Sequence, residues 1–493
     1  MKEKKEKQEK SKDGKDEKGL SVRKSEDFSR WYSEIVQKAE LADLRYNVKG
    51  FLVFRPWSVL CMEKMYAYLE RTLQRKGHKP YYFPTLIPEN NLKKESGHIR
   101  GFTPEVFWVT EAGDTKLDER LALRPTSETA FYQMFGIWIR SYKDMPFKTY
   151  QRANVFRYET KATRPFLRSR EFHWIETHCA FASEGDAEKQ VKEDMEITEE
   201  VLHDIFGLPF IFFERPTWDR FPGARRTFAA DVLNPDGRVV QQPSTHFISE
   251  EFSKAFNVTF KDKDGKDKFA YMTCYGPAVS RIFASVVIVH GDDKGLRFPW
   301  EIAPLQVVIV PVSDDKMLIK KAEELKRQIE KIASVEVDLS ERSAGEKFNY
   351  WEMKGVPIRI DLGLKDLAQG KVTIFRRDLD KKELISEKLL MQHIEKLSEE
   401  ISKNLREQAD DIFKGKIKDV KNVKEMKKVI EDGGIARCGF CSVNKDGESC
   451  AAVVEKEVGA KVRGTKLEKE KVSENCAVCG KKAGEIVYIA RDY

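Results

Sequence analysis

The two β-like runs at 148–158 and 171–181, with the basic turn between them, constrain the fold more than any other stretch. Side chains on a strand alternate between faces, so residues two apart share a face. Arg157 therefore shares a face with Glu159. The second run presents an aromatic ring, an acid and an imidazole on one face: Trp174, Glu176 and His178. The pattern predicts an antiparallel hairpin that carries functional groups.

The turn of this hairpin adds positive charge through Arg164, Arg168 and Arg170. A planar guanidinium binds phosphate oxygens in pairs, so arginines fixed on a rigid hairpin are suited to a triphosphate. A neighbouring carboxylate can accept a hydrogen bond from an amino group or hold a metal ion. The alternative is an exposed hairpin with surface ion pairs, which the aromatic–acid–histidine alternation disfavours.

Length and charge limit the class of protein. A chain of 493 residues is too long for one ordinary core, so two to four domains are expected. A net charge of +7 is compatible with a polyanionic partner. We see no apolar run of membrane-spanning length and no apolar signal core. We therefore expect a cytoplasmic protein that does not bind a membrane.

Pattern changes divide the chain into four predicted parts. Residues 1–27 are rich in Lys, Glu and Asp and predict a disordered charged tail, either solubilising or binding RNA nonspecifically. Residues 28–303 carry dense β-like runs, which indicate an antiparallel sheet. Residues 304–413 alternate β and α and predict a parallel or mixed sheet, ending in a long helix over 383–413. Residues 414–493 form a last unit.

Five of the eight cysteines lie in this last unit: Cys438, Cys441, Cys450, Cys476 and Cys479. The two Cys-x-x-Cys pairs, 438–441 and 476–479, have the spacing of a tetrahedral zinc site. Cys450 leaves open which cysteine completes the set. A closed four-thiolate shell has no position for a substrate, so this zinc would be structural. Free thiols without a metal are the alternative.

Three segments resemble the motifs of class II aminoacyl-tRNA synthetases. The hairpin resembles motif 2. A Gly-x-x-x-x-Arg turn at 276–281, followed by an apolar helix, resembles motif 3. A predicted helix at 57–76 that leads to a proline-containing strand at 81–89 resembles motif 1, which forms the dimer interface in that class.

From about residue 28 onward, the chain resembles the prolyl-tRNA synthetases of the archaeal and eukaryotic type. Besides the hairpin, the resemblance rests on the segments 123–129, 290–296 and 347–357, the cysteines and the terminal Tyr493. It implies an α+β multidomain fold with a class II antiparallel-sheet catalytic domain, an α/β anticodon-binding domain and a small zinc-containing C-terminal α+β domain. It also implies a homodimer that joins L-proline to tRNA(Pro) in two steps, through prolyl-adenylate.

The resemblance also assigns roles toward ATP. Arg157 and Arg281 are the catalytic residues: Arg157 holds the α-phosphate, while Arg168 and Arg281 hold the β- and γ-phosphates. Glu159 meets the adenine amino group or Mg²⁺, and Gln241 also binds ATP. Such a site works by positioning and by fixed positive charge, with Mg²⁺ bridging phosphate oxygens.

A further set of residues is implied for proline: Thr126, Glu128, Trp174, Glu176, His178, Ser244 and His246. Thr126 and Glu128 would receive the secondary ammonium group, and Trp174 would form a wall for the ring. Core packing is the alternative for Trp174. Where the family usually has Gln-Gly-Gly-Thr-Ser-His, residues 241–246 read Gln-Gln-Pro-Ser-Thr-His. Two glycines are lost, so this pocket loop is expected to lie differently.

The family's cysteine pattern favours Cys441, Cys450, Cys476 and Cys479 as zinc ligands, whereas spacing alone favours Cys438 over Cys450. Anticodon bases would be read by side chains of the third part, with these candidates: Glu352, Lys365, Arg376 and Arg377. A solvated helix face or strand end is the alternative for each of them.

Three kinds of rival function are weighed against this one, the first being another class IIa synthetase. A threonyl enzyme needs zinc ligands in its catalytic pocket, and a glycyl enzyme has no ring to place against Trp174. A non-catalytic RNA-binding regulator would be expected to lose a phosphate-binding arginine, yet Arg157, Arg168 and Arg281 are all present. A zinc-ribbon nucleic-acid module leaves residues 123–303 unexplained.

Overall fold

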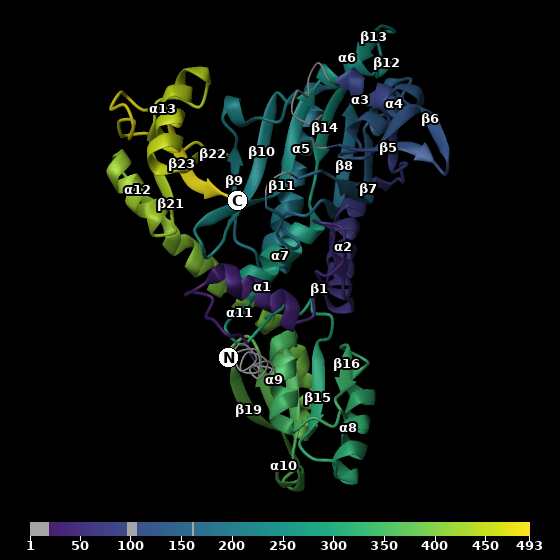
Figure 1. The fold of residues 1–493 in the computed structure, drawn as a ribbon, viewed down its shortest axis with the longest axis vertical. Helices are drawn as coiled ribbons and strands as arrows, with labels where there is room; N and C mark the ends of the chain where they lie inside the picture. The colour runs from purple at the N-terminus through teal and green to yellow at the C-terminus, as the bar shows by residue number, and fades with distance from the viewer. Residues whose placement is uncertain (1–18, 96–105, 160–161) are drawn as a thin grey trace, which may run out of the picture. The chain divides into compact units, whose positions relative to one another are not determined.

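A computed structural model of the chain describes residues 19–95, 106–159 and 162–493 (Figure 1). The chain forms two compact units. The smaller comprises the residues up to Leu41 and His290–Glu399, and the larger comprises Ala42–Val289 and Glu400–Tyr493. Within the described ranges, no helix is both long and apolar enough to cross a membrane.

Most of the expected charged tail, residues 1–18, lies outside the described residues. The rest of it, residues 19–27, is packed within the smaller unit. Lys24 donates through Nζ to the carbonyl of Gly291 at 2.7 Å, and its backbone N–H donates to Asp293 at 2.8 Å. Packed structure therefore begins before Phe28, because these backbone and ammonium groups find fixed partners.

One sheet of eleven strands organises the larger unit, in the order β20-β21-β23-β22-β9-β10-β11-β14-β8-β7-β3 (Figure 1). The strands from the first part of the chain are β3 (Lys79–Pro80), β7 (Phe147–Phe156), β8 (Glu171–Phe181), β9 (Ile211–Glu214), β10 (Arg226–Leu233), β11 (Arg238–Ser249) and β14 (Tyr271–Tyr275). All neighbours from β7 to β9 pair antiparallel, which confirms the predicted sheet type. Strand β3 joins this part of the sheet in parallel, on β7, and the C-terminal strand β23 (Glu485–Asp492) pairs in parallel with the start of β11.

The predicted hairpin is present as β7 and β8. Their register runs from Phe147 opposite Ala180 to Phe156 opposite Glu171. Arg157 lies just past the strand end and extends the ladder once, since its N–H donates to the carbonyl of Arg170 at 2.9 Å. The hairpin therefore holds the base of the basic turn rigidly.

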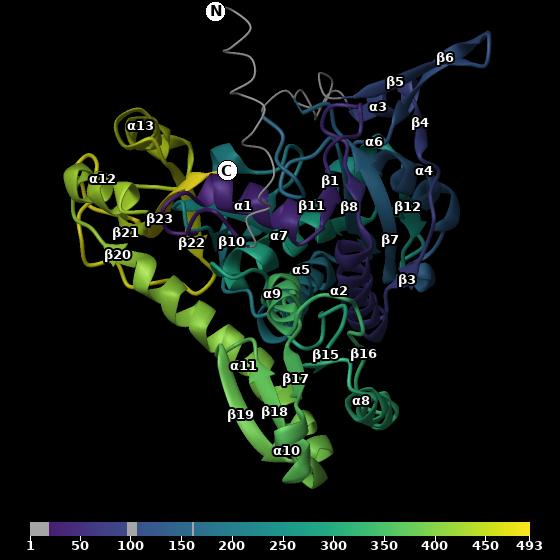
Figure 2. The ribbon, with the colours of Figure 1, turned by 60° about the horizontal axis from the view of Figure 1, so that its bottom comes forward.

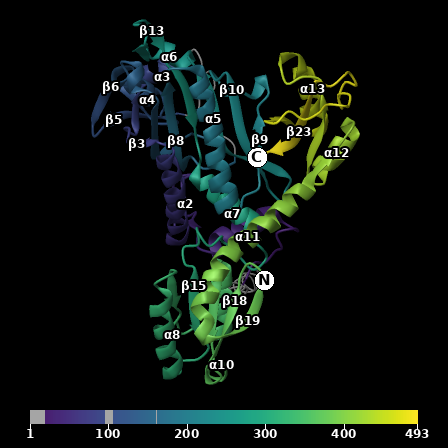
Figure 3. The same cartoon turned by 180° about the vertical axis from the view of Figure 1, so that it is seen from behind.

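Helices cover this sheet and frame its ends. The helices of the larger unit include α2 (Pro56–Arg75), α4 (Glu128–Trp138), α5 (Glu184–Thr198) and α7 (Val279–His290). A wider helical segment, η3 (Glu199–Ile205), continues α5. Helix α5 packs across β11, β14 and β8. Figure 3, seen from behind, shows α5 lying along this sheet. Smaller elements are β1 (Ala42–Asp43), β2 (Val53–Phe54), β4 (Leu86–Pro88), α3 (Glu89–Glu95), β5 (Phe107–Ala112), β6 (Thr115–Leu123), α6 (Glu251–Ala255), β12 (Thr259–Lys261) and β13 (Asp267–Phe269).

The C-terminal residues extend the same sheet. They form β20 (Ile417–Asp419), α12 (Val423–Glu431), β21 (Ile435–Phe440), α13 (Glu448–Val453), β22 (Lys461–Lys466) and β23 (Glu485–Asp492) (Figure 2). Strand β22 pairs with β9, with Thr465 opposite Glu214 and Lys466 opposite Phe213. The expected third unit thus shares backbone hydrogen bonds with the hairpin-bearing sheet.

The smaller unit holds a five-stranded sheet in the order β16-β15-β17-β18-β19. Its elements are α1 (Phe28–Lys38), β15 (Val307–Pro311), α8 (Lys316–Ile329), β16 (Val335–Val337), α9 (Ala344–Lys354), β17 (Ile358–Leu362), α10 (Leu364–Ala368), β18 (Lys371–Arg376) and β19 (Lys381–Ser386). Strand β15 pairs in parallel with β16 and β17, whereas β18 and β19 pair antiparallel. The sheet is therefore mixed, and α8 packs on β15 and β16 (Figure 2).

The helix predicted over 383–413 begins too early. Residues 381–386 form β19, and α11 occupies Leu390–Lys416. Strand β19 pairs along the whole of β18, and Lys382 forms an ion pair with Asp361 at 2.9 Å. Tertiary pairing thus overrides the local helical pattern, as happens readily where intrinsic preferences are weak.

The stretch predicted as an altered pocket loop, 241–246, is part of β11. Its ladder with β10 passes from Ser244 opposite Ala229 to Gln241 opposite Asp231. Gln242 and Pro243 therefore lie together opposite Ala230, as a bulge. Proline is tolerated at a bulge because no ladder hydrogen bond is required there. Gln242 donates to the hydroxyl of Ser285 at 2.7 Å, which anchors the bulge to α7.

The junction between β22 and β9 predicts one stability effect. Gly464 has φ +129°, and a Cβ there would overlap the carbonyl oxygen of Glu214. We expect Gly464→Ala to lower the free energy of unfolding by more than about 2 kcal/mol, because both strain and clash arise. Thermal unfolding measures this. Gly185→Ala, in open space in α5, is the control and should change little; an equal loss in both would contradict the assignment.

Candidate active site

A cavity of 260 Å³ opens on one face of the larger unit's sheet. It is lined by residues from the hairpin, from β10 and β11, and from the turn that precedes α7. Ten residues singled out from the sequence border it: Thr126, Glu128, Arg157, Trp174, Glu176, His178, Gln241, Ser244, His246 and Arg281. Thr126 and Arg281, which are about 150 positions apart in the sequence, thus border the same cavity.

One end of the cavity collects positive charge. Desolvation and the neighbouring charges of Arg157 and Arg168 lower the pKa of Arg281 to about 10, which leaves it charged at neutral pH. Arg281 donates to the carbonyl of Gln241 at 3.1 Å. Arg157 donates to the carbonyl of Pro125 at 3.0 Å. Guanidinium groups that raise one another's energy in this way are suited to a polyanion, which would relieve the repulsion.

Arg168 and Glu159 lie beside this end rather than among the residues that line the cavity. Their side chains are 3.7 Å apart. Arg168 also donates to the backbone oxygen of Tyr493 at 2.6 Å, and Arg164 donates to the Tyr493 hydroxyl at 2.5 Å. The last residue of the chain therefore contacts the basic turn, a contact that the sequence alone did not predict.

The other end holds two buried carboxylates of opposite character. Burial raises the pKa of Glu128, and the charge of Glu176 adds to the effect. The pKa of Glu176 is lowered although burial opposes this, because hydrogen bonds from His178, Ser127 and Gln151 stabilise the ionised form. Neighbouring acids whose pKa values are pushed apart are typical of functional sites. Thr126 donates a hydrogen bond to Glu128.

Trp174 forms a flat side of the cavity. A Cβ at position 276 would lie 3.4 Å from its ring, so Gly276 allows the indole to approach the backbone closely. Phe172 meets the ring edge-on at 5.6 Å between centroids. Across the cavity, desolvation and the charge of Arg215 lower the pKa of His246 to about 3, so this imidazole is neutral. Its ring nitrogens lie 3.1 Å from Thr227 and 3.0 Å from Ser244.

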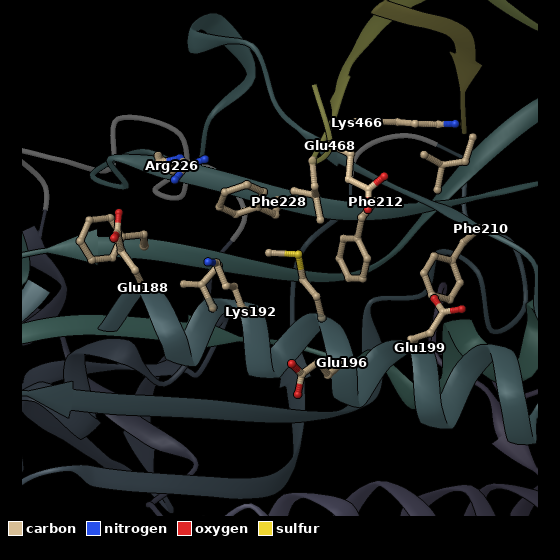
Figure 4. Close-up of a pocket in the computed structure, with 15 residues that line it drawn as sticks. Glu188, Lys192, Glu196, Glu199, Phe210, Phe212, Arg226, Phe228, Lys466 and Glu468 are labelled. Carbon is tan, nitrogen blue, oxygen red and sulfur yellow. The ribbon is translucent and has the colours of Figure 1, made fainter. Parts of the chain in front are cut away.

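A larger cavity of 730 Å³ lies on the opposite face of the same strands (Figure 4). Alternation along the strands explains this: Thr227 and His246 face the smaller cavity, while Phe228 and Phe247 face the larger. The helix α5 contributes Glu188, Lys192 and Glu196, and Glu199 follows at the start of η3; all four are exposed. Solvated charges are the ordinary state of a helix surface, whereas the smaller cavity encloses buried ones. The smaller cavity is therefore the candidate active site.

Behind the candidate site lies a buried acid that sequence patterns did not reveal. Asp194 on α5 accepts hydrogen bonds from Thr245 at 2.7 Å and from Gln190 at 2.8 Å. Thr245 sits between Ser244 and His246 on β11, so this contact steadies the strand that lines the cavity. Burial raises the pKa of Asp194 to about 7. In the sequence it is one acid among many in α5, and only packing distinguishes it.

Two buried arginines and an aspartate were also missed. Asp231 is fully buried and receives hydrogen bonds from Arg215 and Arg463. Their charges hold the pKa of Asp231 at about 2, against the effect of burial. These three residues lie between positions 215 and 463. Because they are so far apart in the sequence, no short motif could have shown that they meet.

Four cysteine sulfurs meet in the C-terminal part of the larger unit. The Sγ atoms of Cys441, Cys450, Cys476 and Cys479 all lie within 4.8 Å of one another. The Cys441–Cys450 pair is 3.6 Å apart. A tetrahedral zinc site with Zn–S bonds of about 2.3 Å has sulfur–sulfur edges of about 3.8 Å, so the group fits that ion. Cys438 is buried in β21 and is not a member of the group.

The anticodon candidates lie in the smaller unit. Three of them form ion pairs within it: Glu352 with Arg359, Arg376 with Asp378, and Arg377 with Asp292. Lys365, on α10, is exposed. A cavity of 680 Å³ in this unit is lined by Glu352 together with Tyr350, Arg342 and Lys38. Lys365 and Glu352 are thus accessible, whereas Arg376 is buried.

Comparisons with known proteins agree with one another over most of the chain. Three family profiles match it: "tRNA synthetase class II core domain (G, H, P, S and T)" over 107–290, "Anticodon binding domain" over 306–404 and "Prolyl-tRNA synthetase, C-terminal" over 423–493. The proline–tRNA ligase of Thermofilum pendens is 47% identical over 97% of this chain and all of its own length. That of Methanopyrus kandleri is 42% identical over 95% of this chain and 96% of its own.

Two solved structures are similar throughout. The prolyl-tRNA synthetase of Giardia lamblia in complex with prolyl-adenylate has a TM-score of 0.94 and 36% identity, covering 96% of this chain and 100% of that one. The enzyme of Cryptosporidium parvum, complexed with halofuginone and AMPPNP, has a TM-score of 0.92 and 29% identity, covering 97% and 100%.

Asp194 predicts an unusual dependence of stability on pH. Its pKa is higher in the folded than in the unfolded chain, so folding loses stability as pH rises from about 4 to about 7. We expect Asp194→Asn to match the original protein near pH 4 and to exceed it by a few kcal/mol at pH 8. Thermal unfolding across this range measures the difference.

The control for this experiment is Asp186→Asn, which changes an exposed acid on the same helix. It should give no stabilisation that grows with pH. A difference between Asp194→Asn and the original protein that stays constant with pH would contradict the raised pKa.

Proposed function

This chain belongs to the prolyl-tRNA synthetase family, and on that premise we propose that it attaches L-proline to tRNA(Pro) in two steps with ATP. In the first step, a carboxylate oxygen of proline attacks the α-phosphorus of ATP, giving prolyl-adenylate and pyrophosphate. In the second, a hydroxyl at the 3′ end of the tRNA takes the prolyl group and AMP leaves. The observation that carries this proposal is one cavity with gathered arginines at one end and a buried acid pair at the other.

ATP is assigned to the arginine end. Arg157 would hold the α-phosphate and stabilise the charge that develops there, and Arg281 and Arg168 would hold the outer phosphates. Support comes from the desolvation of Arg281 and its repulsion by the other two. Fixed donors in a dry site act strongly on developing charge because they need not reorganise during the reaction. Gln241 and Glu159 complete this end.

Magnesium fits the same end. Mg²⁺ is held by few protein oxygens and mainly by substrate phosphates. Glu159 supplies a carboxylate 3.7 Å from Arg168, beside the proposed phosphate positions. When bound, the ion would neutralise phosphate charge.

Proline is assigned to the end lined by Thr126, Glu128, Glu176 and His178. The secondary ammonium group would lie near Glu128 and Thr126, and its arrival would favour ionisation of Glu128, whose pKa burial raises. Glu176, ionised and held by His178 at 3.2 Å, would fix the pocket floor. Trp174 offers the ring a flat apolar wall, and Ser244 and His246 close the side opposite.

The zinc proposal rests on the donor set. Cys441, Cys450, Cys476 and Cys479 would hold one structural Zn²⁺, since four thiolates suit this ion and leave no open position. The loop around these cysteines continues from β21 into α13, so the ion would tie these elements together.

The remaining assignments concern partners and domains. We assign 28–303 to catalysis, 304–413 to the anticodon, with Glu352, Lys365 and Arg376 as its candidate residues, and 414–493 to the zinc-containing domain, in line with the matched profiles. A homodimer is supported by exposed apolar side chains of the motif 1-like region: Leu60 is 50% and Tyr82 is 84% exposed. We also assign the enzyme to the cytoplasm, because its proposed product is charged tRNA for protein synthesis.

The central test is amino-acid-dependent exchange of pyrophosphate into ATP. We expect strong exchange with proline alone among the twenty amino acids, and at least a 100-fold loss in Arg157→Ala, roughly the effect of removing one fixed donor from a charge-stabilising site. Arg225→Ala, which changes an exposed arginine paired with Glu184, serves as the control and should stay within twofold. No exchange with any amino acid would overturn the enzyme proposal.

The zinc proposal predicts different effects for the substitution of Cys450, a proposed ligand, and of Cys438, which is not one. We expect Cys450→Ser to lose the metal and to lower the unfolding temperature, because three thiolates cannot close the shell. Cys438→Ser should keep one zinc per chain. Metal content of the purified variants decides: retention in the first and loss in the second would place the site on Cys438 instead.

A further inference from the structure

A carboxylate buried between two domains' strands connects the C-terminal region to the candidate active site. Asp231 on β10 is fully buried. Arg463 on β22 donates to it through Nε at 2.7 Å and through Nη2 at 3.2 Å. Arg215, which follows β9, donates to the same carboxylate at 2.7 and 3.0 Å. One acid thus holds two arginines, each by two hydrogen bonds.

Arg463 reaches Asp231 because β22 is irregular there. Its ladder with β23 shifts register between Val462 and Gly464, which places Arg463 at a bulge. A bulge redirects a side chain relative to the regular alternation. The carbonyl of Arg463 also accepts a hydrogen bond from Arg215 at 2.8 Å. On this side, Arg215 is therefore held by two groups. One is the backbone carbonyl of Arg463, and the other is the carboxylate of Asp231, to which Arg463 also donates.

The other side of Arg215 meets the cavity. Its Nη2 donates to Oε1 of Gln241 at 3.2 Å. A guanidinium has no acceptor, so this contact fixes the orientation of the Gln241 amide: the oxygen faces Arg215, and both N–H groups of Nε2 are left to donate elsewhere. The backbone carbonyl of Gln241 is held by Arg281. Gln241 is thus fixed at the arginine end of the cavity, with donors to offer an oxygen-rich ligand.

Stability alone does not account for this cluster. Buried ion pairs are weak contributors to stability, because desolvation of the charges offsets their attraction. Bidentate geometry, in contrast, fixes position well. A second arginine on Asp231 restricts the carboxylate, and the carboxylate in turn restricts Arg215. The chain of contacts therefore transmits order from β22 to the amide of Gln241.

We propose that Arg463, in the C-terminal domain, is a positioning residue for ATP: through Asp231 and Arg215 it sets the amide of Gln241. This inference rests on the proposed function, since it needs ATP at the arginine end of the cavity. The C-terminal domain is then part of the active-site scaffold, and its sequence influences substrate affinity from a distance.

Steady-state pyrophosphate exchange on the full-length protein tests the inference. We expect Arg463→Met to raise the KM for ATP about tenfold while the KM for proline stays within twofold. Arg463→Lys keeps a charge for Asp231 but cannot donate two parallel hydrogen bonds, so its KM for ATP should rise about threefold. It also provides a measurement should the methionine variant fail to fold. Arg437→Met is the matched control, because Arg437 is a paired arginine of the same domain outside the cluster.

A double-mutant cycle identifies the route. If Arg463 acts through Gln241, then Arg463→Met should add no further increase in the KM for ATP to Gln241→Ala. Multiplying effects, a parallel rise in the KM for proline, or a KM for ATP equal to that of Arg437→Met would each overturn the inference. Zinc content and unfolding temperature, measured alongside, exclude loss of the fold. Absence of proline-dependent exchange in the unaltered protein would instead contradict the proposed function.

Discussion

The pairing of antiparallel strands in the larger unit is the constraint on which the active site depends. Because alternate residues point to opposite faces, β10 and β11 present Thr227 and His246 to the candidate site and Phe228 and Phe247 to the other side. The same strands thereby line one cavity with polar side chains and a second cavity with aromatic ones. A shift of register by one residue would exchange the two faces, so the backbone ladder and the chemistry of the site are fixed together.

Charge in this site is arranged before any substrate arrives. At one end, Arg281 is desolvated and repelled by Arg157 and Arg168, a state that an incoming polyphosphate would relieve. At the other, Glu176 is ionised through its hydrogen bonds while Glu128 is driven toward its neutral form by burial. The two ends of the cavity therefore suit ligand groups of different charge. The fold holds these groups in unfavourable surroundings, which is the usual state of sites that bind charged ligands.

The continuity of the sheet gives the C-terminal region a place in this arrangement. Strand β22 pairs with β9, and Arg463 reaches Asp231 within the sheet. Next to Asp231 in the ladder, the bulge of β11 at Gln242 and Pro243 lets two non-glycine residues occupy positions where the family usually has glycines. The expected disturbance of a pocket loop is therefore absorbed by a local irregularity of a strand. At both bulges a side chain is directed to a distant partner: Arg463 to Asp231, and Gln242 to Ser285.

The sequence by itself determined the family, the antiparallel sheet, the hairpin and ten of the residues that border the cavity, because strand alternation and short motifs are local properties. It also indicated a four-cysteine site but left Cys438 and Cys450 open. Only the tertiary structure decided that Cys450 lies in the group, that 381–386 is a strand rather than helix, and that Arg215, Asp231 and Arg463 meet. These outcomes depend on contacts between distant segments, where burial and pairing outweigh local preference. Sequence spacing carries no information about which distant segments will become neighbours.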